Sequence, residues 1–367
     1  MDLKREEMIL RRNDMSTTDL NIYDESVVAL ERLGKHNLAA HDIGVTFERQ
    51  TTGDDERKFT SYVNLENHKI FSAYILAEVG SEAEGTWLAA YPKKMPPSKL
   101  PLTDDSTAQR MVIAARCPSG APKKLAEAFQ DFMAVLDTIR ADDQDEETKK
   151  RENFQVTEWA NRSDGDLLKP YDIMILRLLQ LPTYERVPTK GSQETSSGVA
   201  RRPRNKKSST QEDVSMEPSV GVSPTVDDRK IGDTYHPNML PDHRGPYFDH
   251  RDSKLVQRDY IDRDHHLIAP HELYEKLTEG TLFSAQISLH TFSFGGRVPN
   301  KIYHIYVEKL QIHDLGYGEI WKPSIPSIPS SSTPASPQKR FKMEKDEEVN
   351  KASDAFSSMS PSKKVKT

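Results

Sequence analysis

The sequence predicts an α+β protein with a small N-terminal α+β domain and a β-rich C-terminal module. Apolar side chains recur at helical spacing in residues 123–140, and they alternate with polar side chains in residues 281–294 and 301–314. Of the 367 residues, 35% are hydrophobic and 29% are charged, which is too little apolar material to bury the whole chain. We therefore expect folded regions that are joined and followed by disordered segments.

The N-terminal domain is expected to cover residues 20–181, after a flexible N-terminus of residues 1–19. A helix over residues 24–33 opens it, with Asp24 as the N-cap and Gly34 just past the end. Alternating apolar residues predict strands at 41–48 and 71–79, with shorter candidates at 86–91 and 111–115. In the first strand the apolar positions are Ile43, Val45 and Phe47.

The helix over residues 123–140 is the clearest in the chain. Pro122 precedes it, where a missing N–H costs little. A highly charged stretch follows at residues 141–152, and the apolar segment at 171–181 is expected to pack back on the domain as one helix. The apolar stripe, which fits packing on a sheet, consists of Leu125, Phe129, Phe132, Met133, Leu136 and Ile139.

Two segments lack apolar periodicity and are predicted to be disordered: a basic linker at residues 182–233 and a Ser/Pro/Lys tail at 323–367. Short basic clusters in such segments are what nuclear import receptors bind, so we expect a nuclear protein with a cytoplasmic pool. Contact with a nucleic-acid backbone is one alternative, and charge that only keeps the chain soluble is another. The basic residues are Arg201, Arg202, Arg204, Lys206, Lys207, Lys339, Arg340, Lys342, Lys363, Lys364 and Lys366.

Both tail clusters follow a serine that resembles a site of proline-directed kinases. Ser336 and Ser360 each begin a Ser-Pro-x-Lys pattern. A phosphate would add about −1.5 to −2 charge beside the lysines. We therefore expect a phosphoprotein in which phosphorylation could control import or nucleic-acid binding.

Two further features narrow the class of protein. Cys117 is the only cysteine, which excludes an intramolecular disulfide and fits a reducing compartment. The longest apolar runs are near ten residues, whereas a membrane helix needs about 20. We expect no membrane partner.

The C-terminal module is expected to cover residues 234–322. It begins with a segment rich in histidine and aspartate, continues with a short helix at 270–277, and ends in a hairpin of two long strands. One face of the hairpin is apolar and predicts a core; it carries Phe283, Ala285, Ile287, Leu289, Tyr303, Ile305 and Val307.

The other hairpin face is polar but contains aromatic rings. Gln286, Ser288, His290, Phe292, His304 and Tyr306 fall there. A β surface of this kind, with Lys301 and Lys309 nearby, can stack single-stranded bases and would fit part of a small barrel of the oligonucleotide/oligosaccharide-binding kind. A solvated or partner-covered sheet face is the alternative. The candidate nucleic-acid residues are His290, Phe292, Lys301, His304, Tyr306 and Lys309.

A family resemblance covers part of this module. The block at residues 270–314, with Gly280-Thr281-Leu282 before the first strand and Lys301-Ile302-Tyr303 opening the second, resembles a segment in uncharacterised proteins of mushroom-forming fungi. The resemblance implies a shared β-rich module and carries no function with it.

The histidine-rich segment offers the only candidate chemistry of an enzyme. His243, His250, His265 and Asp264 could bind a divalent metal. Their spacing is loose, and no His-Glu-x-x-His helix or nucleotide-binding glycine motif occurs. We expect no cofactor.

Taken together, these patterns predict a nuclear, non-enzymatic binding protein that contacts single-stranded nucleic acid through its C-terminal β module. A protein–protein adaptor without nucleic-acid affinity is one alternative, and a metal-dependent hydrolase is another. The partners expected are a nuclear import receptor, single-stranded nucleic acid and a protein that the sequence does not identify.

Overall fold

The computed structural model describes residues 3–14, 20–53, 57–89, 111–148, 155–157, 159–161, 172–178, 183–184, 229–243, 253–295 and 300–322. Within these ranges the chain is a mixed α+β protein, as predicted. Most of the predicted linker and the whole predicted tail lie outside the described residues.

The described α-helices are few. They are α1 (Leu3–Asn13), α2 (Ile22–Leu33), α3 (Lys123–Thr148) and the single turn α4 (Leu273–Lys276), beside the short 3-10 helices η1 (Gly34–His36), η2 (Leu38–Ala40) and η5 (Pro237–Met239). Asn21, rather than the predicted Asp24, is the N-cap of α2, because its side-chain oxygen accepts a hydrogen bond from the Asp24 N–H at 2.8 Å. Gly34 ends α2 with a φ of 47°, as expected of a residue just past a helix.

Helix α3 confirms the predicted apolar stripe and extends beyond it. All six stripe side chains are at most 2% exposed. The helix continues through the acidic stretch as far as Thr148. Asp143 in that stretch is buried, because the sheet supplies cationic and hydroxyl partners for its carboxylate.

The described strands form one large sheet and one small sheet. The large sheet is ordered β1-β2-β12-β3-β4-β7-β13-β11, with β5 on β13 and β6 on β7; the small sheet is β8-β10-β9. Their bounds are β1 (Phe47–Gly53), β2 (Arg57–Asn64), β3 (Ser72–Val79), β4 (Val112–Arg116), β5 (Gln155–Thr157), β6 (Ala160–Asn161), β7 (Ile173–Leu178), β8 (Thr183–Tyr184), β9 (Thr234–Tyr235), β10 (Ser253–Val256), β11 (Asp259–Ile261), β12 (Leu282–Phe294) and β13 (Asn300–Asp314).

Five strands close a ring of pairings. Strand β12 pairs with β3, β3 with β4, β4 with β7, β7 with β13, and β13 with β12. All of these pairs are antiparallel except β7–β13. The β3–β4 link is the shortest, with only Glu78↔Arg116 and Val79↔Ala115 in register. The five strands form a small barrel, which is closed between β3 and β4 by only two residue pairs; we call this short pairing the β3–β4 seam.

The ring corrects the prediction of two separate folded regions. Strands β3, β4 and β7 come from the predicted N-terminal domain, whereas β12 and β13 are the predicted C-terminal hairpin. Strand β12 lies between β2 and β3, and one hydrophobic core contains buried residues of both regions, such as Ile75 and Ile287. Strands remote in sequence pair because each leaves unsatisfied backbone groups and an apolar face that only another strand can complete.

Three local predictions are also wrong. The N-terminus is not flexible throughout, because residues 3–13 form α1 and bury Arg12. The segment predicted as a helix at 171–181 contains strand β7, which pairs with both β4 and β13. The strand predicted at 41–48 begins only at Phe47, since Gly44 has a φ of 80° and Val45 is 71% exposed.

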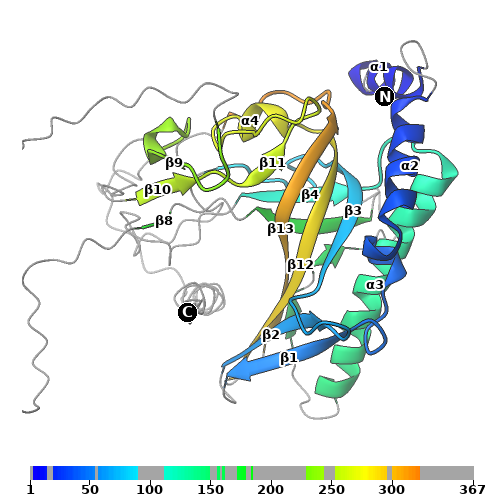
Figure 1. Cartoon of the computed structure of the whole chain (residues 1–367), viewed down its shortest axis with the longest axis vertical. Helices are drawn as coiled ribbons and strands as arrows, with labels where there is room; N and C mark the ends of the chain where they lie inside the picture. The colour runs from blue at the N-terminus through cyan, green and yellow to red at the C-terminus, as the bar shows by residue number, and fades with distance from the viewer. Residues whose placement is uncertain are drawn as a thin grey trace, which may run out of the picture.

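The two faces of the long hairpin have different neighbours. Helices α2 and α3 lie along one side of β12 and β13 (Figure 1). The indole of Trp159 donates to the Leu136 carbonyl of α3 at 3.3 Å, and its ring lies 4.7 Å from the Tyr303 ring. The face that carries Tyr303 is therefore the helix side of the sheet. The predicted core residues of the hairpin are all buried on it.

Candidate nucleic-acid interface

Five aromatic rings gather on the face of the sheet opposite to Tyr303. The Phe59 ring is stacked on His290, with centroids 5.5 Å apart and planes 18° apart, and lies 5.3 Å from Phe292. His290 and Phe292 continue the cluster to the rings of Tyr306 and His304, at 5.1 Å and 4.9 Å. We call this set, Phe59, His290, Phe292, His304 and Tyr306, the aromatic face.

Antiparallel register places these rings together. Phe292 pairs with Phe59 of β2. On the other side of β12, His290 pairs with His304 and Ser288 pairs with Tyr306. Directly paired residues point to the same side of a sheet, so three adjacent strands direct their rings to one side. Phe292 is 9% exposed, and the other four residues are partly exposed.

Polar groups fix the rings of the two histidines. The His304 ring nitrogen Nδ1 lies 3.0 Å from the Tyr306 hydroxyl, and the His290 Nε2 lies 3.2 Å from the Ser288 hydroxyl. Ser288 in turn donates to the Glu308 carboxylate at 2.7 Å. Glu308 sits at the irregularity where Gln286 pairs with Lys309 but the next residue pairs with Val307. The bulge thus turns a carboxylate toward the aromatic face.

Burial lowers the pKa of His290 to about 4. In the unfolded chain the imidazole has a pKa near 6.5, so between pH 6.5 and 4 the unfolded state binds the proton and the folded state does not. We expect the free energy of unfolding to fall as the pH is lowered through this window, by about 3 kcal/mol from His290 alone.

Urea denaturation of the protein and of His290→Gln at pH 7 and pH 4.5 checks this expectation. Other groups, such as His313, titrate in both proteins and cancel in the comparison. The variant should lose less stability on acidification than the unchanged protein. Equal losses would show that His290 does not bind its proton differently in the folded state.

The two predicted lysines do not extend the aromatic face as expected. Lys301 points to the helix side, where its Nζ lies 3.0 Å from Asp143, so its assignment to the interface is wrong. The reason is strand alternation: Lys301 and Tyr303 are two residues apart in β13, so their side chains point to the same face of the sheet. Lys309 is half-exposed, but its Nζ lies 2.8 Å from the Asp259 carboxylate. The ion pair raises the pKa of Lys309.

Phe59 is the member of the aromatic face that the sequence did not predict. Strand β2 has a partly alternating pattern in which Tyr62 and Val63 are buried on opposite faces. That pattern could have predicted a strand. It could not have shown that β2 pairs with the end of β12, because some 230 residues separate Phe59 from its partner Phe292.

The three predicted metal residues that the structure describes, His243, Asp264 and His265, do not form a group with metal-ligand spacing. Asp264 and His265 are exposed in a turn, His243 is half-buried, and His250 lies outside the described residues. In the described part of the chain, the group with metal-ligand spacing is instead Asp262, Asp264 and His266, whose ligand atoms lie within 4.8 Å of one another. Asp262 accepts hydrogen bonds from the backbone N–H groups of the other two, so the turn itself accounts for this cluster.

The remaining predicted sites lie outside the described residues. They are the eleven basic residues of the import clusters and the phosphorylation sites Ser336 and Ser360. Among the described helices, none is both long enough and apolar enough to cross a membrane.

No protein-family model, curated protein or solved structure matches this chain. The function proposed below therefore rests on the arrangement of the residues alone.

Proposed function

We propose that this chain is a non-enzymatic nuclear protein that holds single-stranded DNA or RNA against its aromatic face. The observation that carries the proposal is the gathering of five rings from β2, β12 and β13 on the side of the sheet away from Tyr303 and α3. Each base of a single strand has a π face that can stack on such rings whatever its sequence, which contributes about 1–3 kcal/mol per base.

The connectivity of the ring supports the same class of ligand. In chain order the strands of the ring are β3, β4, β7, β12 and β13. Around the ring their order is β3-β4-β7-β13-β12, so the fifth strand lies between the third and the fourth. The third and fifth strands, β7 and β13, are parallel. Small five-stranded barrels that bind oligonucleotides and oligosaccharides have this connectivity. The support is an analogy of fold, which bears on function less strongly than the site does.

A second candidate is a protein–protein adaptor, which is favoured by the pairing of Lys301 and Lys309 with carboxylates. Lys301 and Lys309 are both paired with carboxylates, so neither adds unopposed positive charge to the aromatic face. Surfaces rich in aromatic rings are also typical of protein interfaces. The two candidates differ in salt dependence, because neutralising phosphates releases counterions.

Replacing Tyr306 with leucine is expected to raise the Kd for a labelled single-stranded oligonucleotide about tenfold. Leucine keeps the apolar bulk but removes one stacking surface, and stacking contributes about 1–3 kcal/mol per base. The measurement is fluorescence anisotropy at two salt concentrations. It uses the full chain, because β12 pairs with β2 and β3 and a C-terminal fragment would lack these partners.

Tyr74→Leu is the matched control for this variant. Tyr74 lies on the same face of the sheet, in register with Gln286, and is likewise partly exposed. It is not one of the five clustered rings. Equal weakening by both variants, or binding that does not weaken with salt, would exclude the aromatic face as a nucleic-acid site and leave the adaptor.

Nuclear import through the basic clusters is the second part of the proposal. We expect a fluorescent fusion to accumulate in the nucleus, and to remain cytoplasmic when residues 339–342 and 363–366 are deleted and the basic residues of 201–207 are replaced by alanine. The basis is that import receptors bind short basic clusters. Nuclear accumulation of the variant would refute the role of these clusters.

A further inference from the structure

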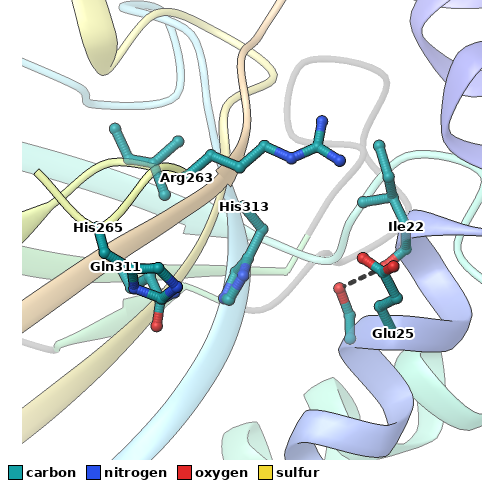
Figure 2. A pocket seen from close by; sticks show the side chains of 8 residues that line it. Ile22, Glu25, Arg263, His265, Gln311 and His313 are labelled. Atoms are coloured by element: carbon teal, nitrogen blue, oxygen red, sulfur yellow. Dashed lines mark hydrogen bonds between the residues drawn. The ribbon is translucent and has the colours of Figure 1, made fainter. Parts of the chain in front are cut away.

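A polar cavity lies on another part of the molecule, where the start of α2 meets the end of β13. Its volume is about 220 Å³. The turn after β11 contributes Arg263 and His265, and β13 contributes Gln311 and His313 (Figure 2). The remaining lining residues are Ile22, Glu25, Ser26 and Ile312.

Arg263 is the cation of this cavity without a carboxylate partner. Its side chain is exposed and extends across the cavity toward the start of α2 (Figure 2). Among the described residues it makes no ion pair. Arg263 also lines the adjoining cavity, together with Asp262 and Asp264. The other basic residues of that cavity are paired, Arg11 with Asp314 at 2.7 Å and Lys276 with Asp262 at 3.5 Å.

Two histidines face the same space. His313 is mostly buried, and its Nε2 lies 2.9 Å from the Ser284 hydroxyl of β12. Burial, followed by the positive charges of His265 and Arg263, lowers the pKa of His313 to about 4. Arg263, His265 and His313 all line this one cavity (Figure 2).

The backbone places His265 at this position at a conformational cost. Its φ is 64°, which is uncommon for a residue other than glycine, and the turn is held by the His265 N–H bonded to the Asp262 carbonyl at 3.1 Å. Such strained residues are found disproportionately at ligand sites. The one carboxylate among the lining residues is Glu25 of α2.

We propose that this cavity binds a small oxyanion of the phosphate or sulfate class through the guanidinium of Arg263, with the imidazoles of His265 and His313 as further donors. The planar guanidinium matches a tetrahedral oxyanion with two parallel hydrogen bonds. The anion stabilises the charged form of the His313 imidazole, so its binding takes up a proton there. Ser284 and Gln311 are neutral, and Glu25 opposes the anion from α2.

Sulfate is the probe of choice because its charge is constant between pH 5 and 8. Titration calorimetry and histidine-ring NMR of the full chain should show saturable binding that is tighter at pH 5.5 than at pH 7.5, with the His265 and His313 signals moving together. Sodium chloride at equal ionic strength should not move them. Inorganic phosphate should compete with sulfate.

Two variant pairs test the assignment of residues. Arg263→Gln should weaken sulfate binding about tenfold or more, because it removes a charged donor, whereas Arg32→Gln near the far end of α2 makes the same change of charge without effect. Glu25→Gln should tighten binding several-fold, and Glu31→Gln should not. Absence of saturable binding, or equal effects within either pair, would overturn the proposal.

Discussion

Replacing Arg12 with alanine is expected to lower the free energy of unfolding by about 3–5 kcal/mol. The side chain is fully buried, and its guanidinium lies 2.7 Å from Glu78 and 2.8 Å from Asp314. It also donates to the Gly280 carbonyl. Without it, two carboxylates stay in a buried site with less positive charge to compensate them. Loss of one partner of a buried ion pair is costly for this reason.

The network around Glu78 explains why α1 matters to the whole fold. Glu78 of β3 also accepts from Arg116 of β4 at 2.9 Å and from the Ser119 hydroxyl at 2.7 Å. Asp314 is the last residue of β13. Arg12 therefore links α1 to two strands of the ring, β3 through Glu78 and β13 through Asp314. The contact with Glu78 lies at the short β3–β4 seam.

Arg11 is a matched control one position away. It also pairs with Asp314, at 2.7 Å, but its side chain is 53% exposed. Exposed ion pairs contribute at most about 1 kcal/mol, so Arg11→Ala should change stability by no more than that. Urea denaturation gives both values from the shift of the midpoint. Similar losses for the two variants would mean that burial is not the source of the effect.

Replacing Asp143 with alanine is expected to have a comparable effect, about 3–5 kcal/mol. Its carboxylate lies 2.7 Å from the Arg49 Nε of β1 and 3.0 Å from the Lys301 Nζ of β13, and it accepts a 2.7 Å hydrogen bond from the Tyr303 hydroxyl. Burial, followed by the charge of Asp143, raises the pKa of Tyr303. Removing the carboxylate leaves the Lys301 ammonium buried without its counter-charge.

Asp142 is the control for this variant because it has the same side chain and a similar place in α3. Its carboxylate is 51% exposed and lies 3.8 Å from Arg49. We expect Asp142→Ala to change the free energy of unfolding by less than about 1 kcal/mol. If Asp143→Ala lowers the free energy of unfolding equally little, the contacts of Asp143 with Arg49, Lys301 and Tyr303 do not hold α3 on the sheet.

The prediction of elements was most successful where periodicity is long. Six apolar positions over residues 125–139 predicted α3, and two long alternating runs predicted β12 and β13 with their core faces. The prediction failed for short segments such as β7. Its residues Ile173–Leu178 are almost continuously apolar, which fits a buried strand and a buried helix equally well.

The candidate site was predicted in part for the same reason. Alternation placed His290, Phe292, His304 and Tyr306 on one face, and the register confirms it. The same alternation assigns Lys301 to the face of Tyr303, so this error was avoidable from the sequence. Phe59 was not, because its place depends on which strand β2 pairs with.

The sequence by itself determined the type and the polarity of the long elements of this protein, because side-chain periodicity is a local property of the chain. Only the tertiary structure decided that strands of the two predicted regions close one ring, and that Arg12 meets carboxylates 66 and 302 residues away. Such pairings depend on burial and charge at contacts between remote segments. The side-chain periodicity of one segment does not show which remote segment it will pair with.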